Sequence, residues 1–276
     1  MVISAVIDPF DLHEETGEAS RRSLNIATAR TFDVLSQFVL KKPEFGVTEL
    51  SRELGMTKNM IYRALATLVD HNLLMRDEGG RKYQLSYRIL EFQNPHFPSS
   101  DIRTLAHPYL ERLHQLMNRT IQLSAPAGDG QVVIDGVEGH GVMVKRSKIS
   151  QYFPLHASAA SRAILSCLSD ADIEAYIKRN SPLPAFTETT ITTRKGLFSE
   201  VSQIRERGYA VTIEDFFRGT SGISFPIVAA DGSPHCAVTV AGASQDQEAE
   251  TPEETALKAL PIISELRAIC VLYDRI

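Results

Sequence analysis

Eight residues just before position 101 divide this chain into two parts. The segment 93–100 reads QNPHFPSS, and its two prolines lack the backbone N–H group that a helix or an inner strand needs. At 276 residues the chain is also long for one compact domain. We therefore predict a smaller domain before this segment and a larger domain after it.

The pattern before the break is that of a helix-turn-helix. Helix-spaced apolar residues predict a helix over 24–40, and a short helical segment over 46–55 ends at Gly55, a residue that suits the position after a helix. A further helix follows at once. Thr57 is its candidate N-cap, because the threonine hydroxyl can accept a hydrogen bond from the amides of the first turn.

The helix after Thr57 has two faces of different chemistry. Its apolar stripe consists of Ile61, Leu65, Leu68 and Val69. The opposite face, at helical spacing, consists of Asn59, Tyr62, Arg63 and Ala66. A recognition helix in the major groove needs this division, although an ordinary surface helix shows it too.

Four side chains of this helix have expected partners on DNA. We expect Asn59 to bind adenine and Arg63 to bind guanine, the bidentate pairings that their side chains favour. Lys58 can hold a phosphate. Tyr62 offers its hydroxyl to a phosphate and its ring to a thymine methyl group.

A basic hairpin follows the helix. The sequence DEGG joins expected strands over 73–76 and 82–85, and its glycines suit a tight turn. Arg81 and Lys82 would carry positive charge to the DNA backbone. This wing makes the surface-helix alternative much weaker, and the order of elements predicts a winged helix-turn-helix.

The charge distribution agrees with DNA binding. The formal net charge is -5, yet residues 20–88 carry 12 Lys and Arg against 7 Asp and Glu. Residues 1–19 hold five acidic residues and no basic one, and residues 89–276 hold 17 basic and 22 acidic residues. Local charge sets phosphate affinity. Arg21 and Arg22 either extend into a minor groove or belong to a disordered charged arm.

The larger part of the chain alternates strands and helices. Expected strands are 121–127, 131–136, 141–146, 209–213, 222–228 and 235–241. Expected helices are 101–118, with Pro108 inside it, 157–168, 170–180, 193–207 and a last helix opened by the capping box of Thr251 and Glu254. Strands joined mostly as hairpins, with helices beside them, predict an antiparallel α+β domain of the sensor kind.

Several other classes of protein are disfavoured. No apolar run approaches the roughly 18 residues of a membrane span, and acidic residues follow the apolar N-terminus, the wrong order for a secretory signal. Cys167, Cys236 and Cys270 are far apart and lack CxxC spacing, which disfavours disulfides and zinc. Common enzyme motifs are missing. We therefore expect a cytoplasmic protein without a membrane segment, catalytic site, metal or cofactor.

Several motifs, in this order, resemble the IclR family of bacterial regulators, named for the isocitrate lyase regulator. They are VTELSRELGMTKNMIYRALATL with a wing ending in KYQLS, AHPYLERL at 106–113, FPLHASAASRAIL at 153–165, RERGYA at 205–210 and GISFPI at 222–227. The resemblance covers nearly the whole chain. It is far more specific than a lone helix-turn-helix.

The resemblance implies an α+β chain that binds DNA and a small-molecule effector. Its expected parts are a mobile arm at 1–20, a winged helix-turn-helix at 21–92, a linker and linker helix at 93–118, and an effector-binding domain at 119–276. The last would hold a six-stranded antiparallel sheet similar to GAF and profilin-like folds. The resemblance also implies homodimers or homotetramers on palindromic double-stranded operators, and the helical faces of 24–40 and 101–118 are our candidates for the dimer seam.

The resemblance places an effector pocket against the helix that the HAS motif opens. Carried over by position, the pocket residues are Lys145, Ala157, Ala159, Ala160, Thr212, Thr220, Gly222, Thr239 and Ala241. The residue types support part of this assignment. Free amides at the start of the 157–168 helix suit an anion, and the threonines offer hydroxyls. Alternatively, the alanines are small only because helix and sheet pack closely there.

Two departures from the family pattern fall near this pocket. SRA at 161–163 stands where the family commonly has Gly-Lys-Ala, and TIED at 212–215 stands where it often has an acidic pair. Lys145 and Arg146 fall on opposite faces of a strand, so one of them would supply a counter-charge for an acid. Glu214 and Asp215 are alternative internal partners for that charge.

We expect a repressor of a catabolic operon. A small organic acid or related metabolite would release this repressor from its DNA. The alternatives are an activator of the same family, an enzyme built on the C-terminal fold with a docking winged helix, and an architectural DNA-binding protein without a ligand. GTSG at 219–222 could form an anion nest, but we expect a flexible loop. His156 is expected to be a structural residue at a helix start and not a base.

Overall fold

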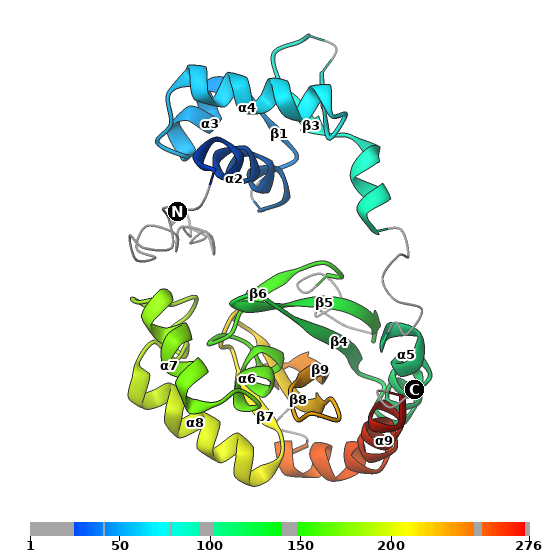
Figure 1. Ribbon diagram of the computed structural model, residues 1–276. Helices are drawn as coiled ribbons and strands as arrows, with labels where there is room; N and C mark the ends of the chain where they lie inside the picture. Colours follow the sequence, from blue (N-terminus) through cyan, green and yellow to red (C-terminus); the bar gives the residue numbers. More distant parts are fainter. Residues whose placement is uncertain are drawn as a thin grey trace. The chain divides into compact units, whose positions relative to one another are not determined.

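The computed structural model describes residues 25–40, 42–77, 79–93, 102–139, 148–245 and 250–273 (Figure 1). These residues form two compact units, one within 25–93 and the other within 102–273. In the described residues no helix is both long and apolar enough to cross a membrane. Residues Arg21, Arg22 and Lys145 and the expected strand at 141–146 lie outside the described residues.

The N-terminal unit is a winged helix-turn-helix. Its helices are α2 (Ile26–Leu40), α3 (Val47–Glu53) and α4 (Lys58–Asp70), followed later by the 3-10 helix η2 (Tyr87–Gln93). Its antiparallel sheet has the order β1-β3-β2, with β1 at Glu44–Phe45, β2 at Leu74–Arg76 and β3 at Tyr83–Leu85. The three predicted helices and the hairpin are confirmed, whereas β1 was not predicted, since two residues show no period.

Local signals fix the ends of these elements. The Met60 amide donates to the Thr57 side chain at 3.4 Å, so Thr57 is the N-cap of α4 as predicted. Gly55 holds φ +61°, the left-handed conformation that glycine adopts without steric cost. In the wing, Gly80 also has positive φ. The end of α3 and the start of α4 are therefore set by their own residues.

The larger unit is built on six antiparallel strands. Their order is β6-β5-β4-β9-β8-β7. The bounds are β4 Thr120–Ala127, β5 Gly130–Val137, β6 Tyr152–Pro154, β7 Ala210–Ile213, β8 Thr220–Val228 and β9 Pro234–Ala243. The predicted antiparallel α+β architecture is confirmed. Strand β6 was not predicted, and the expectation of a loop at 219–222 was wrong, because β8 begins at Thr220 and its register with β9 extends to Ala243.

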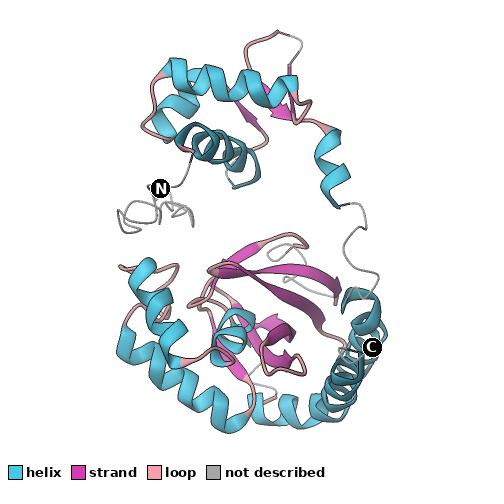
Figure 2. Ribbon diagram, in the orientation of Figure 1, coloured by secondary structure: helices cyan, strands magenta, loops and turns pink. Residues whose placement is uncertain are grey.

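Helices cover the sheet on two sides (Figure 2). On one side lie α5 (Ile102–Met117) and α9 (Pro252–Tyr273), and on the other α6 (Ala159–Ser166), α7 (Asp170–Arg179) and α8 (Arg194–Arg207). The capping box that opens α9 is present, because the Glu254 amide donates to Thr251 Oγ1 and the Thr251 amide donates to Glu254 Oε2. Helix α5 packs on α9 and β4 within this unit.

The two faces of the sheet differ in chemistry. Ile223 and Phe225 of β8 and Val238 and Val240 of β9 are buried in the apolar core that α5 and α9 complete. Because side chains alternate along a strand, the residues between them point to the side of α6. These include Gly222, Ser224 and Thr239. The side of the sheet toward α6 is therefore partly polar, although it is buried.

Candidate DNA-binding face and ligand pocket

The outer face of α4 presents the predicted recognition residues. Lys58, Asn59, Tyr62 and Arg63 are exposed, and Ala66 is half-buried. Ile61, Leu65 and Leu68 are buried in the core of the N-terminal unit, with Val69 packed beside them. The apolar stripe therefore holds the helix in place and leaves base-reading groups in solvent, as a helix in the major groove requires.

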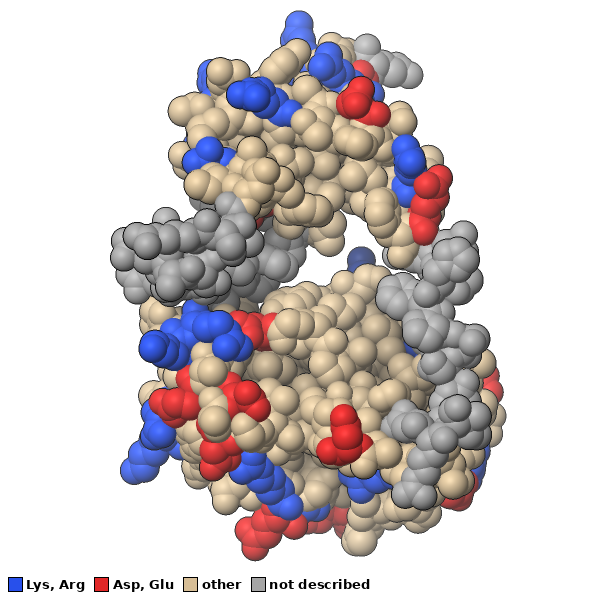
Figure 3. All heavy atoms as spheres, in the orientation of Figure 1, with Lys and Arg blue, Asp and Glu red and all other residues tan. Residues whose placement is uncertain are grey.

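The wing follows α4 in the sequence and carries positive charge at Arg81 and Lys82. Asp77 organises the turn, because its Oδ1 accepts from the Arg81 and Lys82 amides at 2.8 and 2.9 Å. These hydrogen bonds, that of Lys82 first, hold the pKa of Asp77 below its usual range. Figure 3 shows Lys and Arg side chains at the surface of the N-terminal unit.

The two basic residues of the wing differ in their partners. Lys82 Nζ lies 3.2 Å from Glu44 Oε2 of β1, so part of its charge is already neutralised. The Arg81 side chain is exposed and has no ion pair among the described residues. Of the two, Arg81 is therefore the more available phosphate contact.

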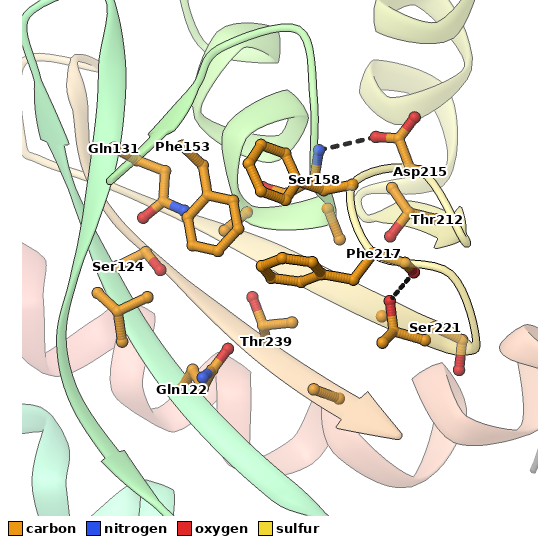
Figure 4. Close-up of a pocket in the computed structure, with 17 residues that line it drawn as sticks. Gln122, Ser124, Gln131, Phe153, Ser158, Thr212, Asp215, Phe217, Ser221 and Thr239 are labelled. Atoms are coloured by element: carbon orange, nitrogen blue, oxygen red, sulfur yellow. Dashed lines mark hydrogen bonds between the residues drawn. The ribbon is translucent and has the colours of Figure 1, made fainter. Parts of the chain in front are cut away.

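The larger unit contains a cavity between the sheet and α6 (Figure 4). Its volume is about 60 Å³, room for several waters or a small organic molecule. Seven of the residues carried over from the family line it, namely Ala159, Ala160, Thr212, Thr220, Gly222, Thr239 and Ala241. Ala157 is fully buried but does not line the cavity.

Several lining residues were not predicted as site residues. They are Gln122, Ser124, Gln131, Val133, Phe153, Ser158, Asp215, Phe216, Phe217 and Ser221. For Gln122 and Ser124 a signal existed, because these polar residues alternate in β4 with the apolar Ile121 and Leu123. The polar residues of β4 belong to the face that lines the cavity.

Phenylalanines form one side of the cavity. The rings of Phe153 and Phe216 have centroids 4.7 Å apart, and those of Phe216 and Phe217 are 4.8 Å apart. Phe186 stacks on Phe216 at 4.2 Å from the segment between α7 and α8. A flat or apolar body would pack well against these rings.

A buried ion pair joins the two departures from the family pattern. Arg162 Nη2 lies 3.3 Å from Asp215 Oδ2, and the two side chains are only 5% and 3% exposed. Burial raises the pKa of Asp215, while the charge of Arg162 and the Ser158 amide oppose that rise. Asp215 therefore has Arg162 as its ion-pair partner. Glu214 accepts the Ser244 hydroxyl at 2.9 Å instead.

The anion position at the start of α6 is partly filled by the protein itself. The Ser158 amide donates to Asp215 Oδ2 at 2.7 Å, and the Ser161 amide donates to Ser158 Oγ at 3.3 Å. Within the described chain, the Ala159 and Ala160 amides have no acceptor. The expectation of a fully free helix start is thus corrected to these two amides, both on lining residues.

The three threonines are not equivalent donors. Thr220 Oγ1 donates to the Phe217 carbonyl at 2.6 Å, and Thr239 Oγ1 donates to Ser224 Oγ at 2.9 Å. Thr212 makes no side-chain hydrogen bond with any described residue. Of the three hydroxyl protons that we expected to serve a ligand, only that of Thr212 is uncommitted.

His156 is buried outside the cavity lining. Its Nδ1 lies 2.7 Å from Tyr176 Oη and its Nε2 lies 2.9 Å from the Pro184 carbonyl. Burial lowers its pKa to about 4, so the ring is neutral at pH 7. Since a carbonyl can only accept, Nε2 carries the proton and Nδ1 accepts from the tyrosine. This arrangement positions the chain before α6 and supplies no base.

Two family descriptions match the chain over most of its length. Residues 27–78 match the IclR helix-turn-helix domain, and residues 96–263 match the C-terminal part of the bacterial transcriptional regulator IclR. The chain belongs to the IclR family. The resemblance noted from the sequence is thereby confirmed, and the protein is a DNA-binding transcriptional regulator. Its named relatives are regulators too, so it is not an enzyme.

Individual relatives support the same assignment. The chain is 30% identical to the HTH-type transcriptional regulator KipR of Bacillus subtilis over 79% of this chain and 86% of that one. It is 25% identical to the HTH-type transcriptional repressor AllR of Escherichia coli over 72% and 73%. The fold is similar, at a TM-score of 0.68 and 21% identity, to an IclR homolog of Microbacterium hydrocarbonoxydans complexed with 4-hydroxybenzoate, covering 88% of this chain and 99% of that one.

Arg63→Ala should weaken operator binding by about 1–3 kcal/mol and relax specificity at one base position in each half-site. Arg81→Ala should weaken all DNA sequences about equally and reduce the salt dependence, because a phosphate contact releases a counterion. Fluorescence anisotropy at several salt concentrations measures both effects. The control is Arg194→Ala, an exposed arginine of the other unit. Unchanged affinity in both test variants would contradict the assignment.

Arg162→Met should destabilise the larger unit by about 3–5 kcal/mol at pH 7, because it leaves the Asp215 carboxylate buried without its cation. The pKa of Asp215 in the folded variant then lies even further above its unfolded value. The folded state binds the proton more tightly, so the deficit is present above that raised pKa and shrinks as the pH falls through it.

Urea unfolding at a series of pH values measures this deficit. The double variant with Arg162→Met and Asp215→Asn is the control, because its amide oxygen can still accept from the Ser158 amide without a buried charge. It should recover much of the loss. A deficit that is the same at every pH would show that Asp215 is not the group responsible.

Proposed function

We propose that the protein is a transcriptional repressor and that a small organic acid bound in the cavity releases it from its operator. The observation that carries this proposal is the pair of free amides, Ala159 and Ala160, at the start of α6 on the cavity wall. Backbone amides at a helix N-terminus favour an anion. The Thr212 hydroxyl is free to donate to the same carboxylate.

Two comparisons support the choice. AllR, which shares 25% identity with this chain, is named a repressor. The structurally similar Microbacterium protein was crystallised with 4-hydroxybenzoate, an acid of a size that the cavity and its phenylalanines suit. The second candidate is an activator of the same family. The described residues give no reason to prefer it.

The charges at the described lining of the cavity cancel each other. Asp215 is the only charged residue that lines it within the described chain, and Arg162 neutralises it. We expect Lys145 or Arg146, whichever of the two points inward, to add positive charge, and both lie outside the described residues. The ligand would favour one arrangement of the two winged helices in an oligomer. A tenfold loss of operator affinity requires about 1.4 kcal/mol of such coupling.

We infer that the chain acts as a homodimer or homotetramer on a palindromic operator. One winged helix covers only a few base pairs, so a longer site needs at least two copies. Helix α2 offers a candidate seam in the N-terminal unit. Its Phe32 and Val39 are 62% and 66% exposed, and they share one face of the helix because seven residues make about two turns.

Phe32→Asp should lower the oligomeric mass measured by light scattering at micromolar concentration, because a carboxylate cannot enter an apolar seam. Operator affinity should fall with it. Leu257→Asp is the matched control, since Leu257 is 70% exposed on α9 and lies outside the candidate seam. A wild-type chain that is a strict monomer, and binds single half-sites, would refute the oligomer.

Operator release is testable on the full chain with a duplex selected from random sequences. Benzoate, 4-hydroxybenzoate, pyruvate and succinate should include at least one acid that weakens binding about tenfold. The matching neutral amides serve as controls for the charge. Thr212→Val should reduce the response to that acid without changing operator affinity in its absence. If DNA binding strengthens with the acid, the protein is not released in this way and the repressor assignment fails.

A further inference from the structure

Two buried polar side chains on neighbouring strands face the cavity without a hydrogen-bond partner among the described residues. Gln131 of β5 and Ser124 of β4 are each only 1% exposed, and both line the cavity. The carboxamide of Gln131 makes no hydrogen bond to any described residue, and its Oε1 is inaccessible to solvent. The Ser124 hydroxyl has no partner in the described part of the chain either.

This arrangement is costly in a ligand-free protein. A buried polar group without a partner costs about 1–3 kcal/mol, and a leucine of similar size in place of Gln131 would avoid that cost. The neighbours of Gln131 cannot compensate, because Val133 lies on the same face and Phe153 is its cross-strand partner in β6. The glutamine therefore fits a bound molecule better than it fits the core.

Gln131 and Ser124 lie opposite the part of the cavity in which we place the carboxylate of the acid. Figure 4 shows Gln131 and Ser124 on one side, Thr212 and Asp215 on the opposite side, and Phe217 between them. An acid held by the α6 amides beside Thr212 would therefore extend past Phe217 toward Gln131. The far end of such a ligand would meet the free carboxamide.

We propose that Gln131 and Ser124 form a neutral subsite that binds a carboxamide or lactam group at the far end of the effector. A glutamine carboxamide presents one acceptor and one donor side by side, and rotation about its last side-chain torsion turns both toward the cavity, where a ligand amide satisfies them at once. A second carboxylate would leave Oε1 unpaired, because an ionised carboxylate accepts hydrogen bonds and donates none. This proposal rests on the proposed function, from which it takes the orientation of the acid.

The test compares three acids with the same ring and different far ends. They are 4-carbamoylbenzoate, 4-methylbenzoate and terephthalate, each titrated by calorimetry into the full chain. The carbamoyl acid should bind at least about tenfold more tightly than either of the others, because only it satisfies the buried carboxamide. Benzamide is the fourth probe, since it offers the amide without the acid.

Gln131→Leu is the decisive variant. It should abolish the preference for the carbamoyl acid over the methyl acid, and the melting temperature of the ligand-free protein should stay the same or rise. A glutamine with only a structural role would lower the melting temperature when replaced. Gln122→Leu is the matched control, because Gln122 lines the same cavity but already has an interaction within the protein. It should leave the ratio of the two affinities nearly unchanged.

The outcomes separate the two proposals. Acids that bind without preference, or a preference that persists in Gln131→Leu, would mean that water satisfies Gln131 and would overturn the subsite. If benzamide binds in a Gln131-dependent way and no acid binds, the subsite stands and the organic-acid effector fails. If none of the four probes binds, neither the acid effector nor the subsite holds.

Discussion

The carboxylate of Asp215 is the group through which the loop after β7 and the start of α6 hold each other. It accepts from the Ser158 amide at 2.7 Å and pairs with Arg162 at 3.3 Å. Ser158 has φ +87°, a conformation that costs a non-glycine residue about 1–3 kcal/mol and persists only where its surroundings fix it. The Asp215 carbonyl also accepts the hydroxyls of Thr187 and Thr190. One wall of the cavity depends on this single residue.

The same carboxylate restricts what the cavity can bind. It occupies the first amide at the start of α6, so among the described residues the Ala159 and Ala160 amides are those left for a ligand anion. Because Arg162 cancels its charge, the described lining contains no net positive charge. Among the described residues, the groups that can contact a ligand are therefore backbone amides, neutral hydrogen-bonding side chains and aromatic rings.

The sheet makes this cavity possible because its faces are used differently. One face, which includes Phe225 and Val238, is a dry core under α5 and α9 and provides the stability of the unit. The other face bears Ser124, Gln131 and Thr239 opposite α6. Burying a polar group without a partner costs free energy, so the polar residues on this face agree with the proposed ligand site.

Most of the fold could be predicted from the sequence, because its signals are local. The threonine cap and the apolar stripe of α4 depend on residues within one or two turns, and the hairpin of the wing depends on its turn glycines. Short elements such as β1 and β6 could not be found this way, since two or three residues carry no period.

The candidate site was predicted less completely, for a physical reason. The resemblance to the family predicted seven small or hydroxyl-bearing residues of the cavity, and the sequence motifs located the part of the chain that contains them. Asp215 and Ser158, however, lie 57 positions apart, and nothing local pairs them. The sequence by itself determined which elements form and which side chains of α4 face outward. Only the tertiary structure decided which polar groups find partners and which, like Gln131, do not, because partners far apart in the chain meet only when the sheet and α6 pack together.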